Sequence, residues 1–292
     1  MSSRLFLTLG GLAVVFSARV GVAQTILGTV RGDGPQAVPF VNIGLPARGL
    51  GTVADEQGRY RLAYNPAFAA DTVRVSSIGF EPRQFTFAAL LATPDIRLVP
   101  APVALAGVRV LAANPRLRIH ELGLAKPSSQ VRLHMASSQL GTELGTLVHL
   151  PRRPALLQSL HLAIMRNEAG PLTFRLNLYR LDSHGRPTTE KLINHDVLVT
   201  AMPQAGVLTA DVSADHLLLS EDFLLAVEWV KGGNGTLPDL ERKLYFGGGL
   251  ALKSTLYMRR ASQANWEIMP FTSNMPLMGL KPQVAFYATV RD

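Results

Sequence analysis

The sequence predicts an all-β fold built from two consecutive sandwiches, and three observations support this. Short runs of alternating apolar and polar residues recur along the chain, separated by turns rich in Gly, Pro, Asn and Asp. No stretch after the first 23 residues shows the periodicity of a long amphipathic helix. The 292 residues include 25 Gly and 19 Pro, which suits many strands and turns. We therefore expect a seven-stranded sandwich followed by a larger, jelly-roll-like one.

The first 23 residues have the features of a signal peptide. Arg4 gives a positive start, residues 5–16 form an apolar run, and small residues stand at positions 21 and 23. We expect cleavage before Gln24 and export, to the periplasm, the outer membrane or the medium. The alternative is an uncleaved anchor helix, but the apolar run is short for a bilayer and Arg19 follows it. Membrane association is therefore expected to be peripheral at most.

Composition narrows the classes of partner. The chain has no cysteine, so an exported form holds no disulfides and no lipoprotein-type thioether anchor. Its formal net charge is +8, but the basic residues are scattered and do not alternate with aromatic residues, which argues against nucleic acid. A basic balance of this kind suits an anionic surface such as lipopolysaccharide or an acidic glycan.

The first predicted sandwich is organised around the stretch from Val38 to Phe80. Strands are expected at residues 38–44, 51–62 (interrupted by a turn) and 73–80. Within the second run, the sequence from Asp55 to Gly58 predicts a tight reversal. Gly58 supplies the positive φ that such a turn needs, and the Asp55 carboxylate accepts hydrogen bonds from backbone amides ahead of it.

Further strands are predicted on both sides of this stretch, at residues 26–30, 84–87 and 95–98. The first run, 38–44, places Phe40, Asn42 and Gly44 on one face. Together these blocks resemble the carboxypeptidase regulatory-like domain, a transthyretin-like (prealbumin-like) β-sandwich of secreted and outer-membrane proteins in Bacteroidetes-type bacteria. The resemblance covers about residues 26–98. It implies an accessory module, because in peptidases this domain carries no catalytic residues.

The rest of the chain predicts a linker and a second sandwich. Residues 101–127 are expected to form the linker, with one extra strand at 108–110. In the second sandwich, Leu160, Leu162 and Ile164 share one strand face, and the run 172–179 alternates cleanly. The predicted organisation is as follows: signal peptide 1–23, regulatory-like domain 24–100, linker 101–127 and a second β-sandwich domain of unknown function 128–292.

No motif for catalysis is found in the sequence. None of the seven histidines is followed by Glu three residues later, so the His-x-x-Glu zinc pair of metallocarboxypeptidases is missing. There is no Gly-x-Ser-x-Gly elbow and no cysteine nucleophile. The pairs His195-Asp196 and Asp215-His216 are adjacent residues that point to opposite faces of a strand, so neither pair is expected to chelate a metal. We predict a protein that is not an enzyme and has no cofactor and no metal.

A polar row on two strands of the second sandwich is the candidate ligand-binding face. If the two strands are neighbours, planar donors and acceptors and one aromatic ring share one outward face, a mixture that sugar-binding sandwiches use. The row consists of Ser159, His161, Arg175, Asn177 and Tyr179, with Glu228 as a further member. The alternative is an ordinary solvated sheet face.

Three classes of function remain open at this point. The first is a non-catalytic exported or cell-surface module that binds a glycan or an outer-membrane or other envelope protein. The second is a soluble relative of the N-terminal extension of TonB-dependent receptors, or a peptidase-associated protein whose carboxypeptidase label is inherited; too little chain follows Leu98 for a plug and a barrel. The third is an enzyme of unrecognised type. The sequence leaves the ligand and the oligomeric state open.

Overall fold

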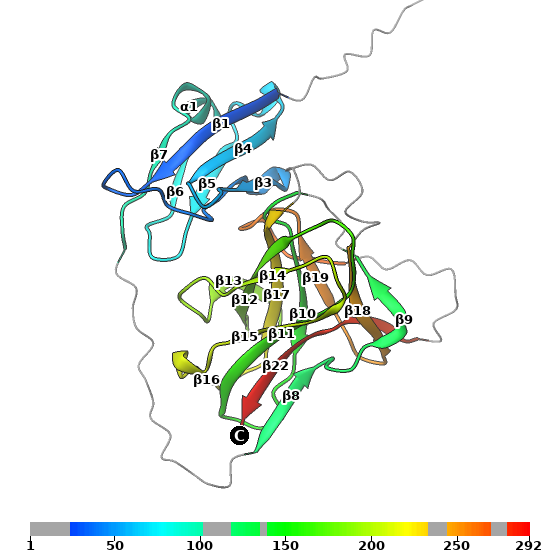
Figure 1. The fold of residues 1–292 in the computed structure, drawn as a ribbon. Helices are drawn as coiled ribbons and strands as arrows, with labels where there is room; N and C mark the ends of the chain where they lie inside the picture. The colour runs from blue at the N-terminus through cyan, green and yellow to red at the C-terminus, as the bar shows by residue number, and fades with distance from the viewer. Residues whose placement is uncertain (1–23, 102–117, 135–138, 233–243, 270–278) are drawn as a thin grey trace, which may run out of the picture.

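The computed structural model describes residues 24–101, 118–134, 139–232, 244–269 and 279–292 (Figure 1). The predicted signal peptide, most of the predicted linker and its strand at 108–110 lie outside these residues. In the described part, four sheets and one short α-helix make up two sandwiches, so the predicted all-β fold is confirmed. No helix in these ranges is long and apolar enough to cross a membrane.

The first domain packs two sheets face to face. One sheet has the order β4-β1-β7 and the other β3-β2-β5-β6. The strands of this domain are β1 Gln24–Arg31, β2 Asn42–Leu45, β3 Leu50–Val53, β4 Arg59–Tyr64, β5 Thr72–Ser76, β6 Arg83–Thr86 and β7 Ile96–Arg97. Alternate residues such as Val30, Ile43 and Val73 are fully buried between the sheets, as the period of two predicts. Helix α1 Phe87–Ala92 connects β6 with β7.

Two local predictions in this domain are wrong. Phe87 begins α1 and does not end a strand, because the Thr86 hydroxyl caps the helix by accepting a hydrogen bond from the Ala89 amide at 3.3 Å. Phe40 lies outside β2, with a φ of 53°, and β2 begins at Asn42. Phe40 therefore contributes a turn at the start of the strand, and its carbonyl becomes available to the second domain.

The predicted turn at Gly58 is confirmed. Gly58 has a φ of 71°, and the Asp55 carboxylate accepts hydrogen bonds from the amides of Gln57 and Arg59 at 2.9 and 2.8 Å. The same Asp-x-x-Gly-Arg turn recurs in the second domain, in residues 182–186. There the Asp182 carboxylate accepts from the amides at 184 and 186, at 2.8 and 2.9 Å. Both turns use the glycine for a left-handed backbone and the aspartate for capping.

The second domain also packs two sheets face to face. One has the order β13-β12-β17-β10-β19-β20, with β14 paired to β12. Its strands are β10 Glu143–Val148, β12 Leu172–Leu181, β13 Pro187–Lys191, β14 Leu198–Ala201, β17 Phe223–Gly232, β19 Leu256–Arg259 and β20 Glu267–Ile268. The other has the order β21-β18-β11-β22-β8, with β15 and β16 paired to β11, and β9 to β18. Its strands are β8 Ile119–Gly123, β9 Ser128–Leu133, β11 Ala155–Asn167, β15 Gly206–Asp211, β16 Leu218–Leu219, β18 Leu244–Ala251, β21 Lys281–Val284 and β22 Phe286–Arg291.

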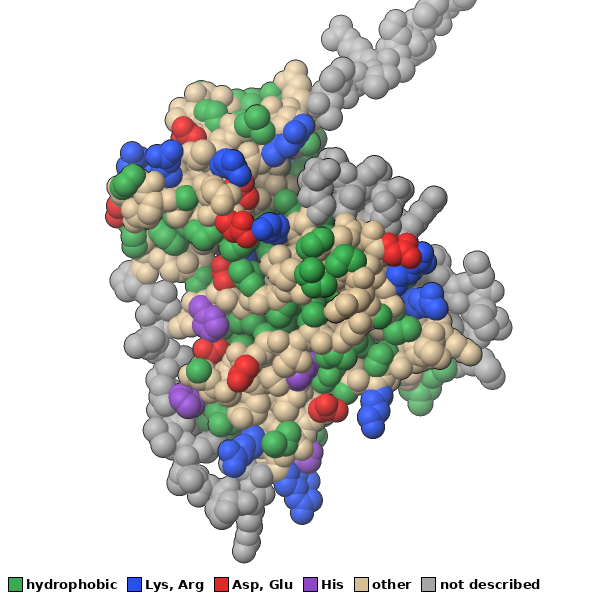
Figure 2. Space-filling model, in the orientation of Figure 1, with side chains coloured by type: hydrophobic (Ala, Val, Ile, Leu, Met, Phe, Trp, Pro, Cys, Tyr) green, Lys and Arg blue, Asp and Glu red, His purple; other side chains and the backbone are tan. Residues whose placement is uncertain are grey.

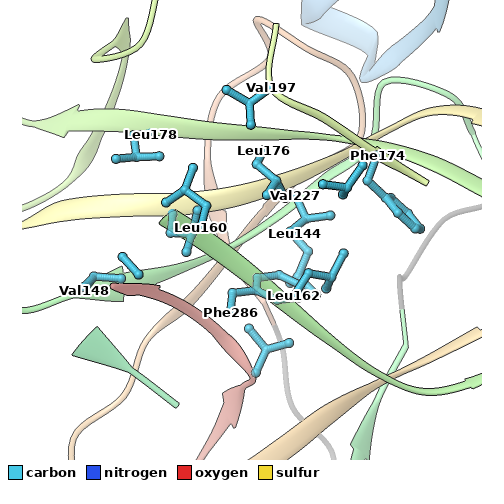
Figure 3. Close-up of a cluster of buried hydrophobic side chains, with 14 of the residues drawn as sticks. Leu144, Val148, Leu160, Leu162, Phe174, Leu176, Leu178, Val197, Val227 and Phe286 are labelled. Atoms are coloured by element: carbon cyan, nitrogen blue, oxygen red, sulfur yellow. The ribbon is translucent and has the colours of Figure 1, made fainter. Parts of the chain in front are cut away.

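The core of this domain lies between the two sheets (Figure 3). Leu160 and Leu162 of β11 face Leu176 and Leu178 of β12, and these four side chains are at most 2% exposed. The predicted inward alternation along both strands is therefore confirmed. At this burial, each such side chain contributes about 2 kcal/mol of hydrophobic stabilisation.

Strand β8 corrects the C-terminal end of the predicted linker. It pairs antiparallel with β22 along its whole length, with Leu122 opposite Ala288. Leu122 is buried in the core of the second domain. The second domain therefore begins by Ile119, within the stretch 101–127 that the sequence suggested as linker. Its strand pattern was hard to detect because only one residue of β8 is buried.

The two domains contact each other along the β3 side of the first sandwich, which faces the second domain in Figure 1. Lys231 lies 2.6 Å from Glu56, and the side-chain amide of Gln139 donates to the carbonyl of Gly49 at 3.4 Å. Gly51 also lies against Ala261, where an added Cβ would be 2.9 Å from the alanine methyl. Close backbone approach therefore explains a glycine at this point of β3.

Candidate functional site

A row of charged side chains crosses four neighbouring strands on the face of the β12 sheet that points away from the core. Arg175 of β12 stands opposite Glu228 of β17, which stands opposite Glu143 of β10, which stands opposite Arg259 of β19. Because facing residues in neighbouring strands share a face, all four side chains meet in one layer. We call these four residues, with Asn177 and Tyr179, the ionic cluster.

Hydrogen bonds join the members of the ionic cluster to its two glutamates. Glu228 Oε2 accepts from Arg175 Nη1 and Asn177 Nδ2, both at 3.0 Å. Glu143 Oε1 accepts from Arg259 Nη2 at 2.6 Å, while its Oε2 accepts from the Tyr179 hydroxyl at 2.9 Å. Arg175 therefore donates to the Glu228 carboxylate and Arg259 to the Glu143 carboxylate. Such charge-assisted hydrogen bonds are stronger than those between neutral groups.

The cluster is buried, although the sequence predicted an outward face. Arg175, Asn177 and Tyr179 are 2%, 3% and 1% exposed. Part of the cover comes from the first domain, since Arg175 Nη2 donates to the Phe40 carbonyl at 2.6 Å. Another part comes from Trp266, whose ring lies 4.3 Å from the Arg259 guanidinium and 5.4 Å from the Tyr179 ring. The prediction of an open face at these residues is wrong, because period-two alternation cannot show that other segments fold over it.

Burial and charge act in opposite directions on the two carboxylates. Burial raises the pKa of Glu143, and the nearby Glu228 adds to this, although Arg259 works against it. Burial also favours a higher pKa for Glu228, but the positive charges of Arg175 and Lys191 outweigh it and lower that pKa. Glu228 is thus held as an anion between two cations. The arrangement holds strands and domains in register: both oxygens of Glu143 and Oε2 of Glu228 accept hydrogen bonds, whereas Glu228 Oε1 is buried without a partner among the described residues.

Ser159 and His161 do not join this face, so the predicted five-residue row is wrong. They lie on β11, which belongs to the opposite sheet and pairs with β15, β16, β18 and β22. The chain crosses from one sheet to the other between β11 and β12, so consecutive strands are not neighbours. His161 is bonded to the hydroxyls of Ser159, Thr209 and Thr289 at 2.8–2.9 Å, and its ring stacks on Tyr287 at 4.3 Å.

The strand alternation assumed for the adjacent His/Asp pairs is wrong, because His195 and Asp196 lie in the loop after β13, and Asp215 and His216 lie at the end of a short 3-10 helix. His195 Nε2 lies 2.8 Å from Asp215, while Asp196 lies 2.9 Å from the Nε of Arg175. Across the described ranges, no group of three or more His, Cys, Asp or Glu residues could hold a metal ion.

Sequence reasoning missed Glu143 and Arg259, and a signal for them was present. Glu228 is the one charged residue within the otherwise apolar run 223–230, which the sequence shows directly. A charge inside an apolar strand requires a buried partner of opposite sign. The partners themselves come from distant strands and could not be assigned.

A second feature is a cavity of about 660 Å³ in the first domain, between the edges of β6 and β7 and beside α1. It is lined by three arginines, an aspartate, an aromatic ring and two threonines, namely Arg31, Arg83, Arg97, Asp95, Phe85, Thr29 and Thr93. The docking contacts of this domain involve β3, which lies in the same sheet as β6 but at the opposite edge. The cavity therefore lies at the edge of the domain opposite to β3, and strands β3 and β7 are on different sides of the domain in Figure 1.

Comparison with known families decides the identity of the first domain. Residues 26–101 match the family model described as the CarboxypepD_reg-like domain. The N-terminal sandwich is a CarboxypepD_reg-like domain. The resemblance seen in the sequence is thereby confirmed, and this family of domains is non-catalytic. None of the curated proteins compared with the chain matches it.

Solved structures of infectious bursal disease virus are similar to the chain at a low level. The Gx strain structure is 11% identical over 91% of this chain, with a TM-score of 0.31, and the Gt strain structure is 11% identical over 91%, with a TM-score of 0.26. The chain spans 62% and 61% of those viral chains. TM-scores of this size carry no inference about this protein.

Proposed function

We propose that this chain is a non-catalytic, exported binding protein of the cell envelope. In this proposal the CarboxypepD_reg-like domain presents a recognition surface and the second sandwich holds that domain in a fixed orientation. A glycan or an envelope protein is the partner. The features that support export are the N-terminal charge, the apolar run and the small residues before Gln24.

The observation that carries the proposal is that one side of the CarboxypepD_reg-like domain contacts the second domain, whereas another side carries a cavity. Its β3 side and the Phe40 turn contact the second domain through Lys231, Gln139 and Arg175. Its β6–β7 side carries the open cavity. A domain fixed on one side and hollowed on the other is suited to presenting a ligand-binding surface.

The charges of the second domain favour a structural role over chemistry. Glu143 and Glu228 accept hydrogen bonds from Arg259 and Arg175 at 2.6 and 3.0 Å. A general base needs a carboxylate that can reach a substrate proton, and these two are fully buried. Without Arg4 and Arg19 of the N-terminal segment, the formal net charge of +8 becomes +6 (8 − 2), and this adds a long-range preference for anionic partners.

Binding and the absence of peptidase turnover can be tested together on the chain that begins at Gln24. The purified protein is applied to a glycan array and to immobilised envelope fractions, and is separately incubated with C-terminal peptide substrates with and without zinc. We expect saturable binding to a glycan or an envelope protein and no hydrolysis. Turnover that follows the protein through purification and disappears with a chelator would contradict the proposal.

A further inference from the structure

The cavity in the CarboxypepD_reg-like domain has three arginines in its walls. Strands β1 and β7 are parallel neighbours, and Arg31 stands directly opposite Arg97 in their register. Like charges placed opposite each other destabilise a sheet. The Arg83 guanidinium approaches the same wall, since its Nη1 donates to the carbonyl of Arg97 at 2.7 Å. Three positive charges therefore converge on one cavity.

None of these three arginines forms an ion pair within the described residues, although the positive charge of Arg31 acts on Asp95 in the same cavity. Among the described residues, no carboxylate lies within ion-pair distance of the side chain of Arg31, Arg83 or Arg97. By contrast, Arg48 and Arg59 in the same domain pair with Asp71 and Asp55 at 2.6 and 2.8 Å. The bonds that Arg83 and Arg97 make are to backbone carbonyls, which leave the positive charge uncompensated. Figure 2 shows basic side chains gathered at this edge of the domain, where β1 and β7 lie in Figure 1.

The cavity also offers a hydroxyl acceptor and an aromatic surface. Asp95 Oδ1 accepts from the amide and hydroxyl of Thr29, at 3.0 and 2.8 Å, and its other oxygen has no such bond within the described residues. These bonds lower the pKa of Asp95, so its carboxylate stays ionised. The Phe85 ring is half-buried and lies 5.7 Å from the Arg83 guanidinium. An anion of high charge density would be repelled by Asp95, whereas a singly charged polyol would use it.

We propose that this cavity binds a uronic-acid unit of an acidic saccharide; this inference rests on the proposed function and names its ligand class. The sugar carboxylate lies between Arg31 and Arg97, whose planar guanidiniums suit bidentate carboxylate recognition. The sugar hydroxyls donate to Asp95. The apolar face of the pyranose ring lies against Phe85. The cavity volume of about 660 Å³ accommodates a ligand of one or two sugar rings.

The test is calorimetric titration of the chain that begins at Gln24 with an oligogalacturonate trimer, compared with a neutral galactose trimer of the same length. We expect the acidic trimer to bind and the neutral trimer to bind at least about tenfold more weakly, because it cannot form the charge-assisted bonds. The double variant R31Q/R97Q should weaken binding of the acidic trimer by at least about tenfold. The control R61Q removes one exposed positive charge outside the cavity, on β4, and should leave affinity within about twofold.

Two further variants distinguish a built site from a general positive patch. D95N should weaken binding of the acidic trimer, because a hydroxyl acceptor is lost; stronger binding after D95N would show simple charge attraction and overturn the inference. F85L should weaken binding of the acidic trimer, because the aromatic surface is lost. An unchanged affinity would show that the pyranose ring does not lie against Phe85. Thermal unfolding of every variant confirms that it is folded.

The inference and the proposed function fail in different ways. If the chain binds another glycan or an envelope protein with an affinity that R31Q/R97Q leaves unchanged, the proposed function stands and the acidic-saccharide site is wrong. If the acidic trimer binds, and R61Q weakens it as much as R31Q/R97Q does, the cavity is not the site. Loss confined to R31Q/R97Q supports the inference.

Discussion

The guanidinium of Arg175 donates a hydrogen bond of 2.6 Å to the carbonyl oxygen of Phe40 and thereby joins the two domains. Phe40 has a φ of 53°, which is uncommon for a bulky residue. The same guanidinium lies 3.0 Å from Glu228 and 2.9 Å from Asp196. One side chain thus connects the buried sheet face, a surface loop and the CarboxypepD_reg-like domain.

Replacing Arg175 by Met should destabilise the protein strongly. The change leaves Glu228 as a buried carboxylate without its arginine and removes the bond to Phe40, and breaking a buried pair costs about 3–5 kcal/mol. Urea unfolding monitored by tryptophan fluorescence measures the loss, since Trp229 and Trp266 both lie in the second domain. The control is Arg180→Met, whose side chain is 46% exposed and should cost less than about 1 kcal/mol. Equal effects of the two substitutions would show that the ionic cluster contributes no special stability.

The two Asp-x-x-Gly-Arg turns allow a matched comparison of glycine substitutions. Gly58 and Gly185 have φ values of 71° and 74°, but only at Gly58 would an added Cβ meet another atom, the Val30 carbonyl at 2.5 Å. Gly185→Ala should cost about 1 kcal/mol for the left-handed backbone alone. Gly58→Ala should cost more, because the clash adds to the strain, and Gly58→Val more again. Thermal unfolding of the three variants tests this order, and an equal cost at both glycines would refute the steric argument.

His161 should make stability depend on pH in a defined direction. Burial lowers its pKa below the ordinary value of 6.5, although Glu121 opposes this. The unfolded chain therefore binds the proton more readily than the folded chain. The contribution is fully present above pH 6.5 and is lost as the pH falls through the lower folded pKa.

Thermal melts of the wild type and His161→Gln across this range test the prediction. The wild type should lose more stability on acidification than the variant. His184→Gln is the control, because that side chain is 73% exposed, and it should keep the wild-type dependence. A dependence that persists in His161→Gln would assign the effect to other groups.

The chain expressed with its first 23 residues in a bacterium that exports proteins should mature at Gln24. Mass spectrometry of the purified protein gives the N-terminus directly. A mass that retains the N-terminal residues would mean that this segment is an anchor. Changing Ala23 to a bulky residue such as Phe should block processing, because signal peptidase reads a small side chain at that position.

Local patterns in the sequence determined which strand residues face the core and where one tight turn forms. Alternation along 172–179 placed Leu176 and Leu178 in the core, and the Asp55–Gly58 turn followed from glycine at positive φ and from aspartate capping. These features depend on neighbours within a few residues, so they can be read directly. The blocks between residues 38 and 80 were also sufficient to identify the CarboxypepD_reg-like domain.

Tertiary structure alone decided which strands are neighbours and which faces are covered. The sequence could not show that β11 and β12 belong to opposite sheets, so Ser159 and His161 were grouped with Arg175 although they lie on another face. It could not show that Arg175, Glu228, Glu143 and Arg259 meet in one row, since that depends on the register of four strands. An alternating strand specifies two faces, but whether the polar face meets water, a second domain or a ligand depends on distant chain segments that come together only in the fold.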